Sequence, residues 1–184
     1  MLDVRVKIDE RSLKEADRIL RAIPRAMPRV MRRAIKRTVD KAVTDFKERI
    51  ARVVNMKKGD IGRALKKRWS SDYGSISAKY TRTGLLEFKG TTQGARGVRY
   101  RIVKGGKRGL IEHGFIARMQ SGHRGVFKRE REIRLPIQEK RGPSVWQIIT
   151  GTAGLLRAAI DKAGNLLGKF IDDQIGVEFR RWKK

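Results

Sequence analysis

The sequence predicts an α+β fold in which long amphipathic helices pack on an antiparallel β-sheet and the C-terminus is helical. This class follows from two switches in hydrophobic periodicity. After a short alternating stretch at Met1 to Ile8, apolar residues recur at helical spacing through about residue 70, alternate with polar residues between 74 and 137, and return to helical spacing from 144. With 184 residues and 39% hydrophobic content, the chain is long enough for one domain with a core and too short for two ordinary ones. We therefore expect a single domain over residues 1–184, with a mainly helical basic part at 1–70, a sheet at 74–137 and helices at 144–184.

Three elements are expected before residue 60. Residues Met1 to Ile8 alternate apolar and polar side chains, which predicts a strand. Ser12, with Glu15 at the capping-box spacing, predicts a short helix that stops near Pro24. A long amphipathic helix from about Pro28 to Val54 is expected to form the centre of the core. The positions it should bury are Ile35, Val39, Phe46 and Ile50.

The middle of the chain changes from helix to strands. A short basic helix is expected around Asp60 to Arg68, with Leu65 facing inward. Ile133 to Ile137 alternates, and Pro136, which has no backbone N–H, places this strand at a sheet edge or at its last rung. Alternation and glycine-containing turns predict further strands at 76–80, 86–88 and 98–102, with turns at 90–97 and 105–109.

Two helices are expected at the C-terminus. Val145 to Ile149 form a short apolar segment, and Ser144 directly before it is expected to cap the helix. Gly151 breaks the pattern, and helical spacing then continues from Leu156 to Ile171. This long segment is the least basic of the predicted helices, so it can lie against the sheet or against a neighbouring subunit.

The charge balance is extreme. Lys and Arg number 46 against 19 Asp and Glu, for a formal net charge of +27. Self-repulsion at that charge destabilises a compact monomer, so a polyanion or acidic protein neighbours should belong to its working state. The absence of cysteine excludes disulfides and thiolate metal sites. No apolar run approaches the length of a membrane span, so no membrane partner is expected.

Basic residues are concentrated at the start of the long predicted helix, before its first acid, Asp40. Cations at a helix N-terminus oppose the helix dipole, and Arg33 and Arg37 repel one another at i,i+4 spacing. Two interpretations stay open: a solvated basic face, or a face that meets an anion. Arg99 and Arg101, opposite Val98 on a predicted strand, give a second basic face. The candidates for contact with DNA are Arg29, Arg32, Arg33, Lys36, Arg37, Arg99, Arg101 and Arg108.

Catalytic chemistry is not evident, so we expect no enzymatic activity, no cofactor and no metal. His113 and His123 are the only histidines and cannot build a metal site alone. Glu87 and Lys89 on a predicted strand, with Asp72 upstream, are faintly like the metal site of some nucleases, but the usual Pro-Asp context is missing. A metal-dependent nuclease therefore remains a minor alternative.

The stretch from Gly114 to Val145 resembles the minor tail protein Z, or tail-completion, family of long-tailed phages. The resemblance lies in the order and spacing of its motifs rather than in any one of them. These are Phe115-x-Ala117-x-Met119, then Gly122 to Val126 with Arg129 after it, then Pro136-Ile137, then Gly142-Pro143-Ser144 before a helical C-terminus.

The resemblance implies a structural virion protein that completes the head-proximal end of a phage tail, after assembly in the host cytoplasm. It implies a ring of copies of the chain, six by the symmetry of phage tails. Expected partners are the tail terminator or tail tube protein, head-tail connector proteins and phage double-stranded DNA. The charge alone would equally suit a sequence-independent nucleic-acid-binding protein of ribosomal or nucleoid type, which is the main alternative.

The segment that carries the resemblance is also the expected assembly surface. It combines turns with an edge-like strand, whose unpaired backbone groups can dock on a neighbouring subunit. The apolar residues of this segment have an alternative role, which is to fill the core under the turns. The interface candidates are Phe115, Met119, Arg124, Phe127, Arg129 and Pro136.

Overall fold

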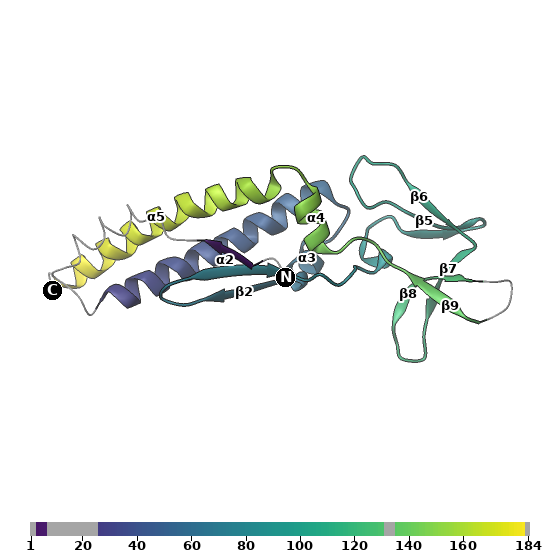
Figure 1. Cartoon of the computed structure of the whole chain (residues 1–184), viewed down its shortest axis with the longest axis horizontal. Coiled ribbons are helices and arrows are strands. Elements are labelled where there is room, and N and C mark those ends of the chain that lie inside the picture. Colours follow the sequence, from purple (N-terminus) through teal and green to yellow (C-terminus); the bar gives the residue numbers. More distant parts are fainter. Residues whose placement is uncertain (1–2, 7–25, 131–134, 183–184) are drawn as a thin grey trace. The chain divides into compact units, whose positions relative to one another are not determined.

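The computed structural model describes residues 3–6, 26–130 and 135–182, and it confirms the α+β class with helices and three antiparallel sheets (Figure 1). The chain divides into two compact units. The helical unit comprises Met1–Phe46, Leu65–Ala78 and Thr152–Lys184, and the sheet unit comprises Lys47–Ala64 and Lys79–Gly151. The single-domain organisation of residues 1–184 stays a prediction.

Two long helices and a three-stranded sheet form the helical unit. Helix α2 (Met27–Val53) contributes its residues up to Phe46, and α5 (Leu155–Trp182) lies beside it in Figure 1. Ion pairs join the start of α2 to the end of α5 and the middle of α2 to the start of α5, so the helices run antiparallel. The sheet has the antiparallel order β1-β3-β2, with β1 Asp3–Val6, β2 Leu65–Trp69 and β3 Gly74–Ala78.

The long predicted helix is confirmed to within one residue at each end. Pro28 lies in its first turn, where the missing N–H costs no helical hydrogen bond. Arg37 is exposed and Arg33 half-buried, so neither faces the core. The predicted apolar stripe is buried at all four of its positions, Ile35, Val39, Phe46 and Ile50.

Strand β3 lies close against α2 at Gly74. A Cβ at this position would come within 2.5 Å of Val39 Cγ2 and 3.0 Å of Ile35 Cγ2, so only glycine fits without movement. An apolar cavity of about 20 Å³ lies between α2, β3 and α5 and is lined in part by Phe46 and Leu167. The three elements therefore share one closely packed core.

Two three-stranded antiparallel sheets and short helices form the sheet unit. One sheet has the order β4-β5-β6, and the other has the order β7-β8-β9. The bounds are α3 Lys58–Ala64, η1 Leu85–Glu87, β4 Thr92–Gly94, β5 Gly97–Tyr100, β6 Gly109–Glu112, β7 Gly114–Arg118, β8 Arg124–Arg129, β9 Ile137–Lys140 and α4 Val145–Gly151.

Several predicted boundaries were wrong. The basic helix expected around Asp60 to Arg68 ends at Ala64, and Leu65–Trp69 is strand β2, because pairing with β3 overrides a local preference for helix. Residues 86–88 were expected as a strand, but Glu87 N–H donates to Gly84 O and closes a 3₁₀ turn. Strand β4 occupies part of the segment expected to be a turn at 90–97.

The strand expected at Ile133 to Ile137 begins instead where that range ends. Strand β9 starts at Ile137, and Pro136 precedes its first rung, because a residue without an N–H cannot donate to the ladder. The edge position predicted for this strand is confirmed, since β9 is the outer strand of its sheet. Ile133 and Arg134 lie outside the described residues, as does the helix expected between Ser12 and Pro24.

The predicted C-terminal helices are confirmed as α4 and α5. Ser144 caps α4 with a reciprocal pair of hydrogen bonds: Gln147 N–H donates to Ser144 Oγ at 3.1 Å, and Ser144 N–H donates to Gln147 Oε1 at 2.9 Å. Gly154, at φ 73°, lies in the break between the helices. Among the helices that the structure describes, none combines the length and apolar character of a membrane-spanning segment.

We expect Gly74→Ala to destabilise the folded chain by about 1–3 kcal/mol, because the added methyl group must displace buried atoms of Val39 and Ile35. Thermal or urea unfolding measures the loss. Gly168→Ala on α5 is the matched control. A Cβ there meets nothing within 4 Å, and a helix gains from alanine, so its stability should stay equal or rise. Equal stability of both variants would contradict the close packing of β3 on α2.

Candidate assembly and nucleic-acid surfaces

The predicted assembly segment folds into the β7-β8-β9 sheet of the sheet unit. A tight turn joins β7 to β8, in which Met119 N–H donates to His123 O at 2.8 Å and Gly122 N–H donates to Met119 O at 2.9 Å. Gly122 has φ 82°, a conformation that glycine adopts without strain. The turn sets the register that places Phe115 directly opposite Phe127.

The two aromatic candidates form a pair on one face of this sheet. Their ring centroids are 6.2 Å apart, within the range of favourable aromatic contacts. Phe127 is buried, with 5% of its surface exposed, whereas Phe115 is half-buried. The Arg129 guanidinium lies over the Phe115 ring, 5.5 Å from its centroid. Phe127 thus packs inside the unit, while Phe115 and Arg129 reach its surface.

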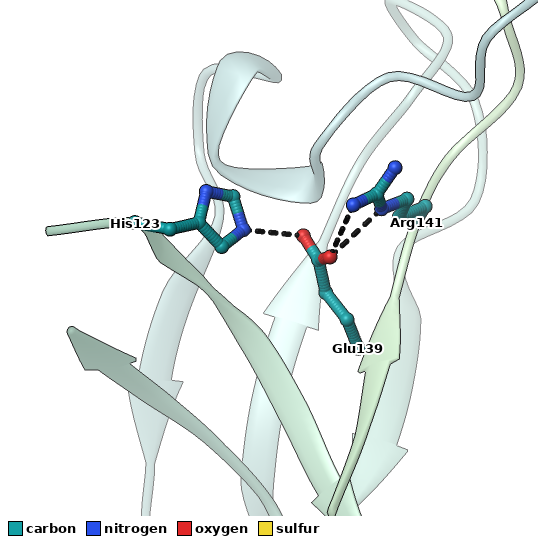
Figure 2. Close-up of polar contacts among 3 residues, drawn as sticks. All are labelled: His123, Glu139 and Arg141. Carbon is teal, nitrogen blue, oxygen red and sulfur yellow. Dashed lines mark hydrogen bonds and ion pairs between the residues drawn. The ribbon is translucent and has the colours of Figure 1, made fainter. Parts of the chain in front are cut away.

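A polar cluster covers the same face beside Phe127. Figure 2 shows His123 and Arg141 pointing at the Glu139 carboxylate from opposite sides. His123 Nε2 lies 2.9 Å from Glu139 Oε1, and Arg141 donates to Glu139 Oε2 through Nε at 2.8 Å and Nη2 at 2.5 Å. The His123 ring also meets Phe127 edge-on, with centroids 6.3 Å apart. The turn before β8 is therefore tied to strand β9.

Burial and two neighbouring side chains determine the protonation of Glu139. Its side chain is only 17% exposed, and burial alone raises the pKa of the carboxyl. The hydrogen bonds from Arg141 and His123, together with the positive charges of those side chains, outweigh burial and bring the pKa below its ordinary value. Glu139 is thus held as a carboxylate, and its charge stabilises the fold at neutral pH.

Strands β7 and β9 are the outer strands of this sheet. Strand β9 pairs with β8 on one side, and no strand among the described residues pairs with its other side, although Arg141 directly after it forms an isolated bridge with Gly84. Leu135 and Pro136, just before β9, are exposed, and 65% of the Leu135 surface is accessible. Arg124 is exposed and Met119 is half-buried at the opposite end of the sheet. Five of the six interface candidates are therefore half-buried or exposed, and Phe127 is buried.

The motif Gly142-Pro143-Ser144 connects this edge strand to α4. Gly142 N–H donates to Thr83 O at 2.8 Å. A Cβ at Gly142 would lie 2.7 Å from Cε2 of Phe88, whose side chain is fully buried. This contact gives a physical reason for glycine here, since any larger residue would displace the Phe88 ring.

The basic candidates on α2 divide into two sets. Arg33 Nη1 lies 3.1 Å from Glu178 Oε1, and Arg37 Nη1 lies 3.7 Å from Asp173 Oδ2, so both guanidinium groups meet acids on α5. The Arg37 guanidinium also lies 4.4 Å from the centroid of the Phe170 ring. These two arginines link α2 to α5, and the α5 acids partly neutralise their charges.

The other α2 candidates lie outward. Arg29 and Arg32 are exposed, and neither has a carboxylate within 4 Å in the part of the chain that the structure describes. Lys36 is exposed and its Nζ lies 5.7 Å from the centroid of the Trp69 ring on β2. Arg29, Arg32 and Lys36 are therefore the α2 cations best placed to meet an external anion.

The three remaining basic candidates belong to the sheet unit. Arg99 on β5 is exposed, opposite the buried side of the strand marked by Val98. Arg108 is exposed in the turn before β6. Arg101 is half-buried, and its Nε is enclosed without a hydrogen-bond partner among the described residues. The structure therefore does not give Arg101 the same outward position as Arg99.

Sequence reasoning missed the roles of Glu139 and Arg141. Their partner His123 is distant in the sequence, and only the pairing of β8 with β9 brings the three together. The nuclease-like pattern is also altered by folding, because Glu87 ends a 3₁₀ turn and does not lie on a strand with Lys89. In the described part of the chain, no three His, Asp or Glu side chains gather as metal ligands would.

Comparison with protein families gives a match over most of the chain. The family model of prophage minor tail protein Z matches residues 11–163. The chain belongs to this family, as the motifs between Phe115 and Ser144 had indicated, and it is therefore a structural protein of a phage tail and of the virion. No curated protein and no solved structure matches it.

We expect Glu139→Gln to destabilise the chain by about 1 kcal/mol at neutral pH, because the charge-assisted bonds to Arg141 and His123 are weakened. A carboxyl with a lowered folded-state pKa stabilises the fold above its unfolded-state pKa, and this stability is lost as pH falls through the folded-state value. The melting temperature of Glu139→Gln should therefore fall less than that of the natural chain on acidification. Exposed Glu112→Gln is the control and should follow the natural chain.

Proposed function

We propose that the chain completes the head-proximal end of a phage tail as a ring of identical subunits, six by the symmetry of tails. The single observation that carries this proposal is the outer edge of β9, which no strand among the described residues pairs, with exposed Leu135 and Pro136 beside it, in a chain that belongs to a tail-protein family. A strand edge can pair with a segment of the next subunit. Repetition of one such head-to-tail contact closes into a ring when the rotation permits.

The neighbours proposed for this ring are the tail terminator or tail tube protein on one side and head-tail connector proteins on the other. The net charge of +27 supports acidic surfaces on at least one of these partners, since like-charged subunits brought together repel. We also propose that the role is structural throughout, without catalysis. Family membership supports this assignment.

We further propose that a basic surface of the ring faces phage double-stranded DNA. Exposed Arg29 and Arg32, with no acid within 4 Å among the described residues, support contact with phosphate groups. The scarcity of aromatic residues, 7% of the chain, favours phosphate contact over base stacking. The contact would then be independent of DNA sequence.

Met119→Asp tests the assembly surface. The Met119 side chain is half-buried at the β7–β8 turn, so an interface role predicts a folded protein that fails to complete tails. Circular dichroism and thermal unfolding report folding, and complementation of a prophage that lacks the gene reports assembly as the yield of infectious particles. Gln120→Asp, exposed in the same turn, is the control and should complement. Full complementation by folded Met119→Asp would remove Met119 from the interface, and an unfolded variant would assign it to the core.

Paired charge substitutions on α2 test the DNA contact. Arg29→Gln with Arg32→Gln should reduce the slope of log K against log salt for a short duplex by about 2, because two phosphate contacts are lost. Arg33→Gln with Arg37→Gln should reduce it by less, because these arginines meet Glu178 and Asp173 on α5. Fluorescence anisotropy across a salt series measures both slopes. A larger effect of the second pair would contradict the outward placement of Arg29 and Arg32.

A further inference from the structure

A basic cleft of about 470 Å³ lies within the sheet unit, apart from every residue assigned above to DNA or to assembly. Its walls come from the end of α2, the segment after it, and two loops that are distant in the sequence. Five of its eight lining residues are cationic and one is acidic. The lining residues are Glu48, Ala51, Arg52, Met56, Lys57, Lys58, Lys89 and Lys104.

Backbone pairing brings these cations together. The segment after α2 runs between two loops: Asn55 N–H donates to Ile102 O at 2.8 Å, and Lys89 N–H donates to Asn55 O at 2.6 Å. Lys104 N–H donates to Val53 O at 2.8 Å, so the last turn of α2 is also tied to the second loop. Lys89 and Lys104 are thus fixed by their main chains on the two sides of one strand-like segment.

Buried side chains next to the cleft lysines support the pairing of these three segments. Val54, Met56 and Phe88 are each at most 4% exposed, and Val54 pairs with Val103 while Met56 pairs with Phe88 as isolated β-bridges. Exposed Lys57 and Lys89 directly follow the buried Met56 and Phe88 in the sequence. The cleft is therefore built on the core of the unit.

The cations of the cleft are largely uncompensated. Lys58 Nζ lies 3.6 Å from Glu48 Oε1, which is the one acid in the lining. Within the described ranges, the other four cations, Arg52, Lys57, Lys89 and Lys104, have no carboxylate within 4 Å, and all four are exposed. Like charges gathered in a concave site focus a positive potential there, and an anion that enters relieves their mutual repulsion.

The composition of the cleft indicates the class of anion. No aromatic side chain lines it, so bases have no platform on which to stack. Its apolar members, Ala51 and Met56, are buried, so a protein segment would find no apolar anchor. The four lysines and Arg52 suit phosphate oxygens, which accept point-charge contacts from lysine and paired hydrogen bonds from arginine.

We infer that this cleft binds phosphate groups of the double-stranded DNA backbone. The inference rests on the proposed contact with DNA and adds a site in the sheet unit, formed by Arg52, Lys57, Lys89 and Lys104. Glu48 holds Lys58 by an ion pair and limits the number of cations free for phosphate. The cleft binds without regard to base sequence and responds strongly to salt.

The test uses the full chain and a 20-base-pair duplex, with affinity measured by fluorescence anisotropy across a salt series. Lys89→Gln with Lys104→Gln should reduce the slope of log K against log salt by about 2. Arg157→Gln with Lys169→Gln, both exposed on α5, removes the same charge from the helical unit and should leave the slope unchanged. Both lysines of the cleft pair are exposed, and unchanged melting temperatures would verify that folding is preserved.

Lysine acetylation of the natural chain, read by mass spectrometry, locates the contact independently. Duplex DNA should protect Lys57, Lys89 and Lys104 and leave Lys169 reactive. If the natural chain binds duplex DNA in a salt-dependent way, but the Lys89 and Lys104 variant keeps the same slope and DNA does not protect these lysines, the cleft is not a DNA site. The proposed DNA contact elsewhere on the chain then still stands. If the natural chain does not bind the duplex at all, both the cleft and the proposed DNA contact are wrong. Stronger protection by a polyglutamate peptide than by the duplex, at equal total charge, assigns the cleft to an acidic protein and overturns the inference.

Discussion

Electrostatic repulsion is the constraint on which the rest of this structure depends. With 46 cations and 19 acids, the chain can neutralise only a minority of its basic side chains internally. In the helical unit the acids lie where elements must be held together: Asp45 meets Lys162, Asp173 meets Arg37 and Glu178 meets Arg33 across α2 and α5. Asp40 meets Lys67 between α2 and β2. Cations away from these contacts remain for external anions, which explains how a folded unit and a strongly basic surface coexist.

The spacing of apolar residues in the sequence predicted the elements that are stabilised mainly by burial of their own amphipathic face. Helix α2 and the core positions Ile35 and Val39 follow from 3.6-residue spacing, and Ser144 follows from its cap. Leu65–Trp69 was misread because three consecutive basic residues carry no strand signal, and only pairing with β3 makes this segment extended. Glu87 was misread because a short apolar run fits a strand or a turn equally well.

The functional surfaces were predictable only in part, because each gathers residues from distant segments. His123, Glu139 and Arg141 meet through strand register, which no local pattern specifies. The basic cleft has a faint signal: Lys89 and Lys104 each directly precede a glycine at a turn. That repetition places two lysines in turns but cannot show that the turns converge beside Val54. Convergence depends on backbone pairing across the unit, which is a property of the fold.

The ion pairs between α2 and α5 have a consequence beyond stability. Exposed pairs of this kind each contribute little to the free energy of unfolding. A slide of α5 by one turn, however, would exchange Asp173 for Lys169 near Arg37 and set two cations face to face. The pairs therefore discriminate between alternative alignments of two helices whose buried apolar residues both recur at helical spacing. In this chain, the few acidic residues therefore specify the register in which α2 and α5 pack.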